Sequence, residues 1–128
     1  MRFLLLIIAA LLAAGCAVYP SARDHARVLA GDSAGRFAAT AMPQGLAYER
    51  LCGSIAEVEG TVTAVVTSGP RRLVLDGVVL VAFAEINEDE AATKRVGERV
   101  LVKGIVRWDP ERQGWLSPAV FLPLPAPQ

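Results

Sequence analysis

The chain is poor in the side chains that most often carry catalysis or bind metals. Its 128 residues include one histidine, His25, and two cysteines, Cys16 and Cys52. A structural zinc site takes four ligands, mostly Cys and His, and a catalytic triad needs a histidine that the fold holds beside its nucleophile. The sequence therefore predicts no metal site, no cofactor and no enzymatic activity.

The chain also lacks a surplus of either charge, and it holds few aromatic residues. Thirteen Lys and Arg balance thirteen Asp and Glu, and aromatic residues make up 6% of the sequence. Residues 54–128 contain eight basic and ten acidic side chains, a net charge of −2. Because proteins that bind nucleic acids usually carry a basic surplus, we expect no nucleic-acid partner.

A long apolar run stands near the start of the chain. It extends over twelve uncharged residues from Phe3 to Ala14 and follows the positive charge of Arg2. A helix needs about 20 residues to cross the roughly 30 Å apolar core of a bilayer, so this run is too short to span it. Its length and its basic start are those of a secretory signal peptide over residues 1–15.

Small residues and a cysteine follow this run, in the order Leu12-Ala13-Ala14-Gly15-Cys16. The order resembles the lipobox of bacterial lipoproteins, in which signal peptidase recognises the residues before the cysteine. Ala14 and Gly15 match its small positions, while Ala13 fills the usual leucine position and Leu12 precedes it. The alternative is an ordinary signal peptide that leaves Cys16 free.

The resemblance implies that the sulfur of Cys16 receives a diacylglyceryl group and that cleavage makes Cys16 the mature N-terminus. Acylation of the new amine would then give a membrane anchor of several chains, palmitate among them, which is far more stable than a single chain. Residue 17 is alanine, where aspartate resembles a signal for retention in the inner membrane. We therefore expect an outer-membrane lipoprotein that faces the periplasm.

Residues 16–53 form the expected anchor and linker. The segment is rich in Ala, Gly, Ser and Arg and has no sustained hydrophobic period. A flexible segment of this length would span about 33 Å, at about 5.5 Å × √n, and would hold the domain clear of the lipid headgroups. Short helical turns are expected within it near residues 24–29 and 47–51.

Residues 54–124 carry the patterns of a β domain, with a short tail at 125–128. Apolar residues alternate with polar ones around Val58–Val66, where Gly60 indicates a bulge or bend. The next strands are expected at 73–75 and 78–83, joined by Asp76-Gly77, a strong hairpin signal. Strands at 100–108 and 115–122 follow, and Pro118 places the last of them at a sheet edge.

A helix is expected between the third and fourth strands. Asn87 can cap its start, with Glu90 three residues later as in a capping box. The order is then β-β-β-α-β-β, that of a small five-stranded Greek-key OB barrel. A valine-rich motif occurs twice, as VEGTV at 58–62 and VKGIV at 102–106.

Together with Leu73-Val74-Leu75, these motifs resemble the OB-fold domains of the tRNA-anti-like kind over about residues 55–124. The alternative fold is a small open β-sandwich. The residues expected in the core are Val62, Val66, Leu73, Leu75, Val79, Val81, Val100, Val102 and Val106.

The hypothesis that follows is a non-catalytic binding module, anchored in the membrane by lipid, that contacts an envelope protein, a peptide or a glycan. The candidate binding face lies on the second and third barrel strands and the loops beside them. Its candidate residues are Arg71, Arg72, Trp108 and Trp115. The simpler interpretation of Trp108 and Trp115 is a cross-strand pair beside the last hairpin.

Two other functions stay open at this stage. If the signal is misread, an OB barrel with basic and aromatic side chains could bind a single-stranded nucleic acid. A thiol-dependent enzyme would use Cys52, the one thiol left after lipidation, whose simpler interpretation is a small apolar side chain at the domain entrance.

Overall fold

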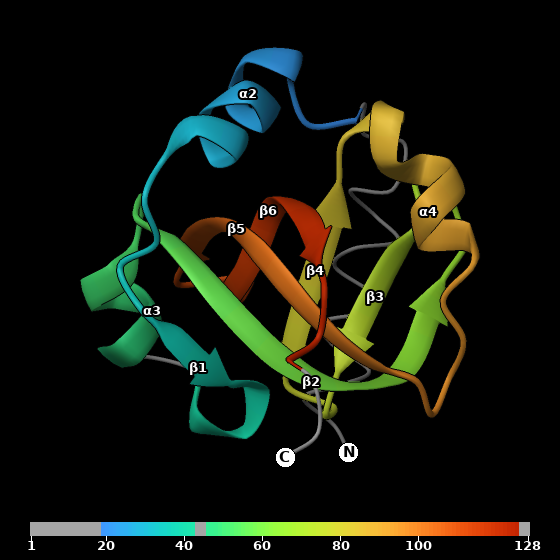
Figure 1. Ribbon diagram of the computed structural model, residues 1–128. Helices are drawn as coiled ribbons and strands as arrows, with labels where there is room; N and C mark the ends of the chain where they lie inside the picture. Colours follow the sequence, from blue (N-terminus) through green and yellow to red (C-terminus); the bar gives the residue numbers. More distant parts are fainter. Residues whose placement is uncertain (1–18, 43–45, 126–128) are drawn as a thin grey trace.

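The computed structural model describes residues 19–42 and 46–125 (Figure 1). In chain order its elements are α2 (Ala22–Ala30), β1 (Arg36–Ala38), the 3-10 turn η1 (Ala39–Ala41), α3 (Leu46–Leu51), β2 (Ile55–Val66), β3 (Arg72–Leu75), β4 (Val79–Phe83), the 3-10 turn η2 (Glu85–Asn87), α4 (Glu88–Ala92), β5 (Arg99–Asp109) and β6 (Gln113–Leu122). No helix within these ranges is long and apolar enough to cross a membrane.

Five of the strands close into a barrel, as the sequence predicts. Neighbouring strands follow the order β2-β3-β4-β6-β5, and β5 pairs again with β2. The β4–β6 pairing is parallel and the others in the barrel are antiparallel. This is the strand order of an OB barrel, so the expected fold class is confirmed.

The core of the barrel consists of the side chains that the alternation predicts. All nine expected core residues, Val62, Val66, Leu73, Leu75, Val79, Val81, Val100, Val102 and Val106, are at most 7% exposed. Asp76 and Gly77 have positive φ angles of 50° and 71°, as the predicted two-residue hairpin turn requires.

The irregularity expected at Gly60 lies three residues further along β2. Gly60 pairs regularly with Val100, and the register shifts between Val62 and Ala64. The hydroxyl of Thr63, the extra residue, donates to the carbonyl of Val74 at 3.2 Å and accepts from the backbone N–H of Gly77 at 2.9 Å. A Cβ at Gly60 would lie 2.8 Å from that of Ala39, so glycine here permits close packing rather than a bulge.

Pro118 does not lie on an edge strand, because β6 pairs with β4 on one side and β5 on the other. Both ladders shift register at this point, between Val81 and Phe83 and between Gly104 and Val106. These two irregularities accommodate a residue that has no N–H to donate. The prediction of an edge was therefore wrong.

The expected flexible linker is also corrected, because its described part packs on the barrel. In α2, Val28 is fully buried against Ile55, Ile105 and Val120. The guanidinium of Arg107 contacts Asp24 at 3.1 Å, and that of Arg27 donates to the carbonyl of Gly53 at 2.7 Å. The helical turns expected near 24–29 and 47–51 are present as α2 and α3.

The capping box expected at Asn87 and Glu90 is not formed. The side chain of Asn87 makes no capping hydrogen bond to α4. Its amide lies 3.4 Å from Nδ1 of His25 in α2 and donates to the carbonyl of Ala119 at 3.5 Å. Asn87 thus links the start of α4 to α2, which brings the two helices to one end of the barrel (Figure 1).

Strand β1 adds a sixth strand outside the barrel and is held there partly by charge. It runs parallel to Glu57–Glu59 of β2. The guanidinium of Arg36 lies 2.8 Å from Oε1 of Glu57. This hydrogen bond is the main reason that the pKa of Glu57 is lowered from its usual 4.5.

We predict that Glu57→Gln lowers the free energy of unfolding at pH 7 by about 0.5 kcal/mol, since one side of the pair is exposed. Because the pKa of Glu57 is depressed in the folded state, its contribution is present above pH 4.5 and is lost as the pH falls through the folded pKa. Urea unfolding of both proteins at pH 7 and pH 3 measures this. A difference that persists unchanged at pH 3 would contradict the assignment.

Candidate functional site

The side chains predicted to form a binding face do not form one. Arg72 is 6% exposed and donates to the carbonyl of Ser68 at 2.6 Å, and its burial lowers the pKa of its guanidinium. Arg71 is partly buried beside α4, with its backbone N–H 3.4 Å from Oε2 of Glu88. A buried guanidinium bonded to its own loop cannot serve as a surface contact.

Trp108 and Trp115 lie on opposite faces of the last hairpin. Trp108 pairs with Gly114 and Trp115 with Arg107, so the tryptophans are one residue out of register and are not a cross-strand pair. Trp108 packs against the barrel core, whereas Trp115 lies outside it under the guanidinium of Arg112, 4.7 Å from its centroid. Both the basic–aromatic face and the cross-strand pair are therefore corrected.

The other sequence-predicted residues fall in two places. Cys52 is exposed in the turn after α3. Leu12, Ala13, Ala14, Gly15 and Cys16 lie outside the described residues. Within 19–42 and 46–125, no three His, Cys, Asp or Glu side chains are grouped so that they could hold a metal ion.

A pocket of about 680 Å³ opens where the chain enters α2 and passes the end of β4. Its lining residues are Tyr19, Pro20, Ala22, His25, Ala84, Glu85 and Ile86. Most of its wall is apolar. Its volume is within the range of small-ligand sites, and convergent polar groups in such a hollow mark a candidate binding site.

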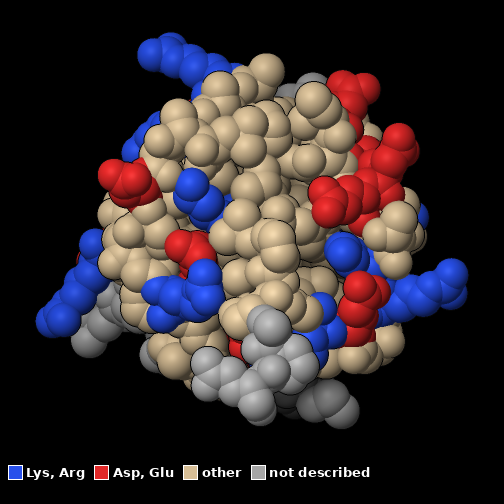
Figure 2. Space-filling view, in the orientation of Figure 1, with Lys and Arg blue, Asp and Glu red and all other residues tan. Residues whose placement is uncertain are grey.

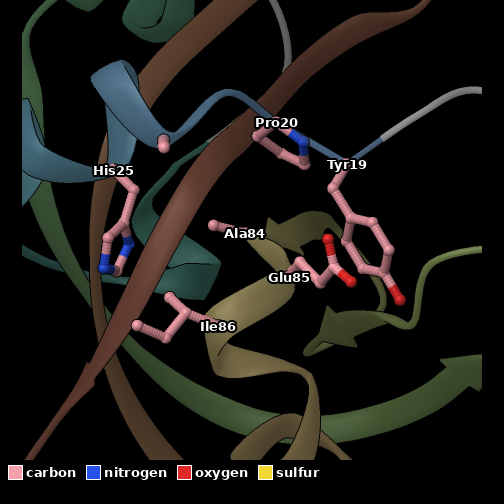
Figure 3. Close-up of a pocket in the computed structure, with 7 residues that line it drawn as sticks. Tyr19, Pro20, His25, Ala84, Glu85 and Ile86 are labelled. Atoms are coloured by element: carbon pink, nitrogen blue, oxygen red, sulfur yellow. The ribbon is translucent and has the colours of Figure 1, made fainter.

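Tyr19 and Glu85 form the polar side of this pocket. Figure 3 shows the carboxylate of Glu85 directed toward the ring of Tyr19. The pKa of the Tyr19 hydroxyl is raised, first by partial desolvation and then by the negative charges of Glu88 and Glu85. Glu85 thus places a carboxylate on this side of the pocket.

His25 and Ile86 form the opposite side (Figure 3). His25 is held by its contact with Asn87, 3.4 Å away. Ile86 is 78% exposed, the highest value among the large apolar side chains of the described ranges. An apolar side chain left in solvent beside a pocket is available for contact with a ligand or a surface.

The charge that the described residues bring to this pocket is negative. No Lys or Arg is among those that line it. Acidic side chains gather over α4 in Figure 2, where Glu88, Asp89 and Glu90 occupy the first helical turn. Among the described residues neither Glu85 nor Glu88 takes part in an ion pair. The pocket therefore suits a ligand that brings a positive charge.

Sequence reasoning missed this pocket because two distant segments form it. Residues 19–25 and 84–86 meet only through the packing of α2 on the barrel. The one signal available was Ile86, an apolar residue set between Glu85 and the acidic run Glu88–Glu90, and a lone apolar residue on a surface is common.

A second, smaller hollow of about 370 Å³ lies between α4 and the end of β6. The ring of Phe121 fills its base, stacked on Phe83 at 4.7 Å, with the ammonium of Lys94 4.8 Å from its centroid. Because Lys94 already covers this ring, the hollow offers less to a ligand than the pocket at Tyr19. Cys52 lines neither of them.

No protein-family model matches the chain, and no curated protein sequence matches it. Among solved structures it is similar to a lipoprotein from Klebsiella pneumoniae subsp. pneumoniae that is provisionally described as nucleic acid-binding. The identity is 12%, the TM-score is 0.47, and the match covers 60% of this chain and 76% of the Klebsiella chain. A TM-score at this level supports no statement about function.

Proposed function

We propose that the chain is a non-catalytic binding module of the bacterial envelope, anchored through lipid on Cys16 in the outer membrane and facing the periplasm. The pocket at Tyr19 is its binding site. The observation that carries this proposal is the short segment of chain between Cys16, the expected anchor, and the pocket. Tyr19, which lines the pocket, is three residues after Cys16.

Covalent geometry limits how far the pocket can be from the anchor. Three extended residues reach at most about 11 Å. The lipobox-like order Leu12–Cys16 would therefore place acyl chains next to the pocket, where a linker of 37 residues would have left the domain about 33 Å away. The binding site would then work at the surface of the membrane.

The side chains of the pocket support binding rather than catalysis. Its titratable groups are Tyr19, His25 and Glu85, and the His25 ring is already engaged with Asn87. A nucleophile activated by a neighbouring base needs the two within hydrogen-bond reach. Among residues 19–42 and 46–125, no serine, threonine or cysteine lines this pocket.

The intact mass of the protein extracted from membranes with detergent tests the anchor. We expect a mass of residues 16–128 plus a diacylglyceryl and an acyl group, in fractions of outer-membrane density. The matched variant Cys16→Ser should keep its full length and carry no lipid, because serine has no thiol to alkylate. Lipid-free mature protein from the unmodified sequence would contradict the proposal.

A further inference from the structure

We propose that the pocket at Tyr19 binds the ammonium-bearing headgroup of a membrane phospholipid and so docks this face of the domain onto the bilayer. The inference rests on the lipid anchor of the proposed function and names the ligand of the same site. Three features of the pocket carry it: its position, its charge and its exposed apolar side chain.

The position restricts what the pocket can meet. Its opening is within about 11 Å of an anchor at Cys16, since Tyr19 follows three residues later. Residues 19–30 are fixed on the barrel by Val28 and by the contact between Asp24 and Arg107. This face therefore cannot swing away from the membrane on a long tether, and headgroups are the ligand present there at the highest concentration.

The charge selects among headgroups. The carboxylate of Glu85 lies beside the ring of Tyr19 (Figure 3), and the negative charge of Glu88 also acts on the Tyr19 hydroxyl. No Lys or Arg is among the described residues of the pocket wall. An ammonium group gains from a carboxylate at this position and from the face of an aromatic ring. A headgroup with no positive charge would meet only like charge at this side.

Ile86 supplies the apolar contact. It is 78% exposed and lines the pocket on the side of His25 (Figure 3). An apolar side chain at this height would enter the boundary between headgroups and acyl chains when the headgroup is bound. If the domain docks in this way, the side chain at position 86 becomes buried at the membrane surface. Exposed apolar side chains elsewhere on the domain stay in water.

The test uses the acylated full-length protein in vesicles, with a polarity-sensitive fluorophore on Ile86→Cys in a Cys52→Ser background. Val96→Cys is the matched control, because Val96 is 65% exposed and lines neither pocket. Vesicles contain lipids with either ethanolamine or glycerol headgroups. We expect a docking equilibrium constant about tenfold larger with ethanolamine for the label at 86, and no change at 96.

Glu85→Gln with Glu88→Gln should abolish the headgroup dependence of the label at 86, with unaltered thermal unfolding showing that the fold is intact. Equal burial of that label in both kinds of vesicle, or its full exposure in both, would overturn the docking proposal. The intact mass of the same sample distinguishes a failure of docking from a failure of the lipid anchor. A protein with the acyl groups but no docking refutes only this inference, and a protein without them refutes the anchor and this inference together.

Discussion

Replacing Gly114 with alanine is expected to lower the free energy of unfolding by about 3 kcal/mol, near the upper end of the usual cost of overpacking a core. The ring of Tyr48 in α3 lies directly on Gly114, so a Cβ at this position would collide with three of its carbon atoms. Tyr48 is completely buried and cannot withdraw into solvent. Each kcal/mol corresponds to about 4–8 °C in Tm for a domain near 100 residues, so thermal unfolding measures the loss easily.

A double-mutant cycle with Tyr48→Ala provides the control. Tyr48→Ala alone should itself cost about 3–5 kcal/mol, as truncation of a buried aromatic residue does. In that background the added methyl group at 114 has room, and Gly114→Ala should cost little. If Gly114→Ala is equally harmful with and without the ring, contact with Tyr48 is not the reason that glycine is needed there.

The second large effect is expected at Val28, where aspartate should lower the free energy of unfolding by about 3 kcal/mol. The change removes a buried valine, a loss of about 1.5–3 kcal/mol, and brings an unpaired carboxylate to an apolar contact. Val28 is fully buried against Ile55, Ile105 and Val120. Chemical unfolding measures the loss, and limited proteolysis within residues 22–35 reports whether α2 has left the barrel.

Leu29→Asp is the matched control for this change. Leu29 is the next residue of the same helix and is 60% exposed, so a carboxylate there stays in water. We expect an effect within about 0.5 kcal/mol and no new cleavage. Equal behaviour of the two variants would show that α2 is not docked as described and that residues 19–35 act as a linker after all.

The barrel was predictable because its strands follow regular local rules. Alternation placed Val62, Val100 and Val102 in the core, and Asp76-Gly77 fixed the second hairpin, since both signals act over a few neighbouring residues. The docking of α2 was not predictable in the same way. Val28 is the one buried residue described in that helix, and a single buried position produces no period.

The errors in the last hairpin come from its register. Asp109 pairs with Gln113, and the positive φ of 63° at Gln113 closes a loop of three residues. This loop length puts Trp108 opposite Gly114, so Trp115 faces the other way. One residue more or less in the loop would have reversed that facing, and the sequence alone does not reveal the choice. The pocket at Tyr19 could not be predicted for another reason, because it forms only when α2 packs on the barrel.

The contact of α2 with the last two strands also decides how the domain would respond to force. If Cys16 carries the proposed lipid anchor, a lateral pull on it would enter the folded part at Tyr19 and pass along α2 into β5 and β6 through Val28 and the Asp24–Arg107 ion pair. The helix would then detach from the barrel at low force. Its residues would lengthen the chain between the anchor and the barrel, and the barrel itself would stay closed.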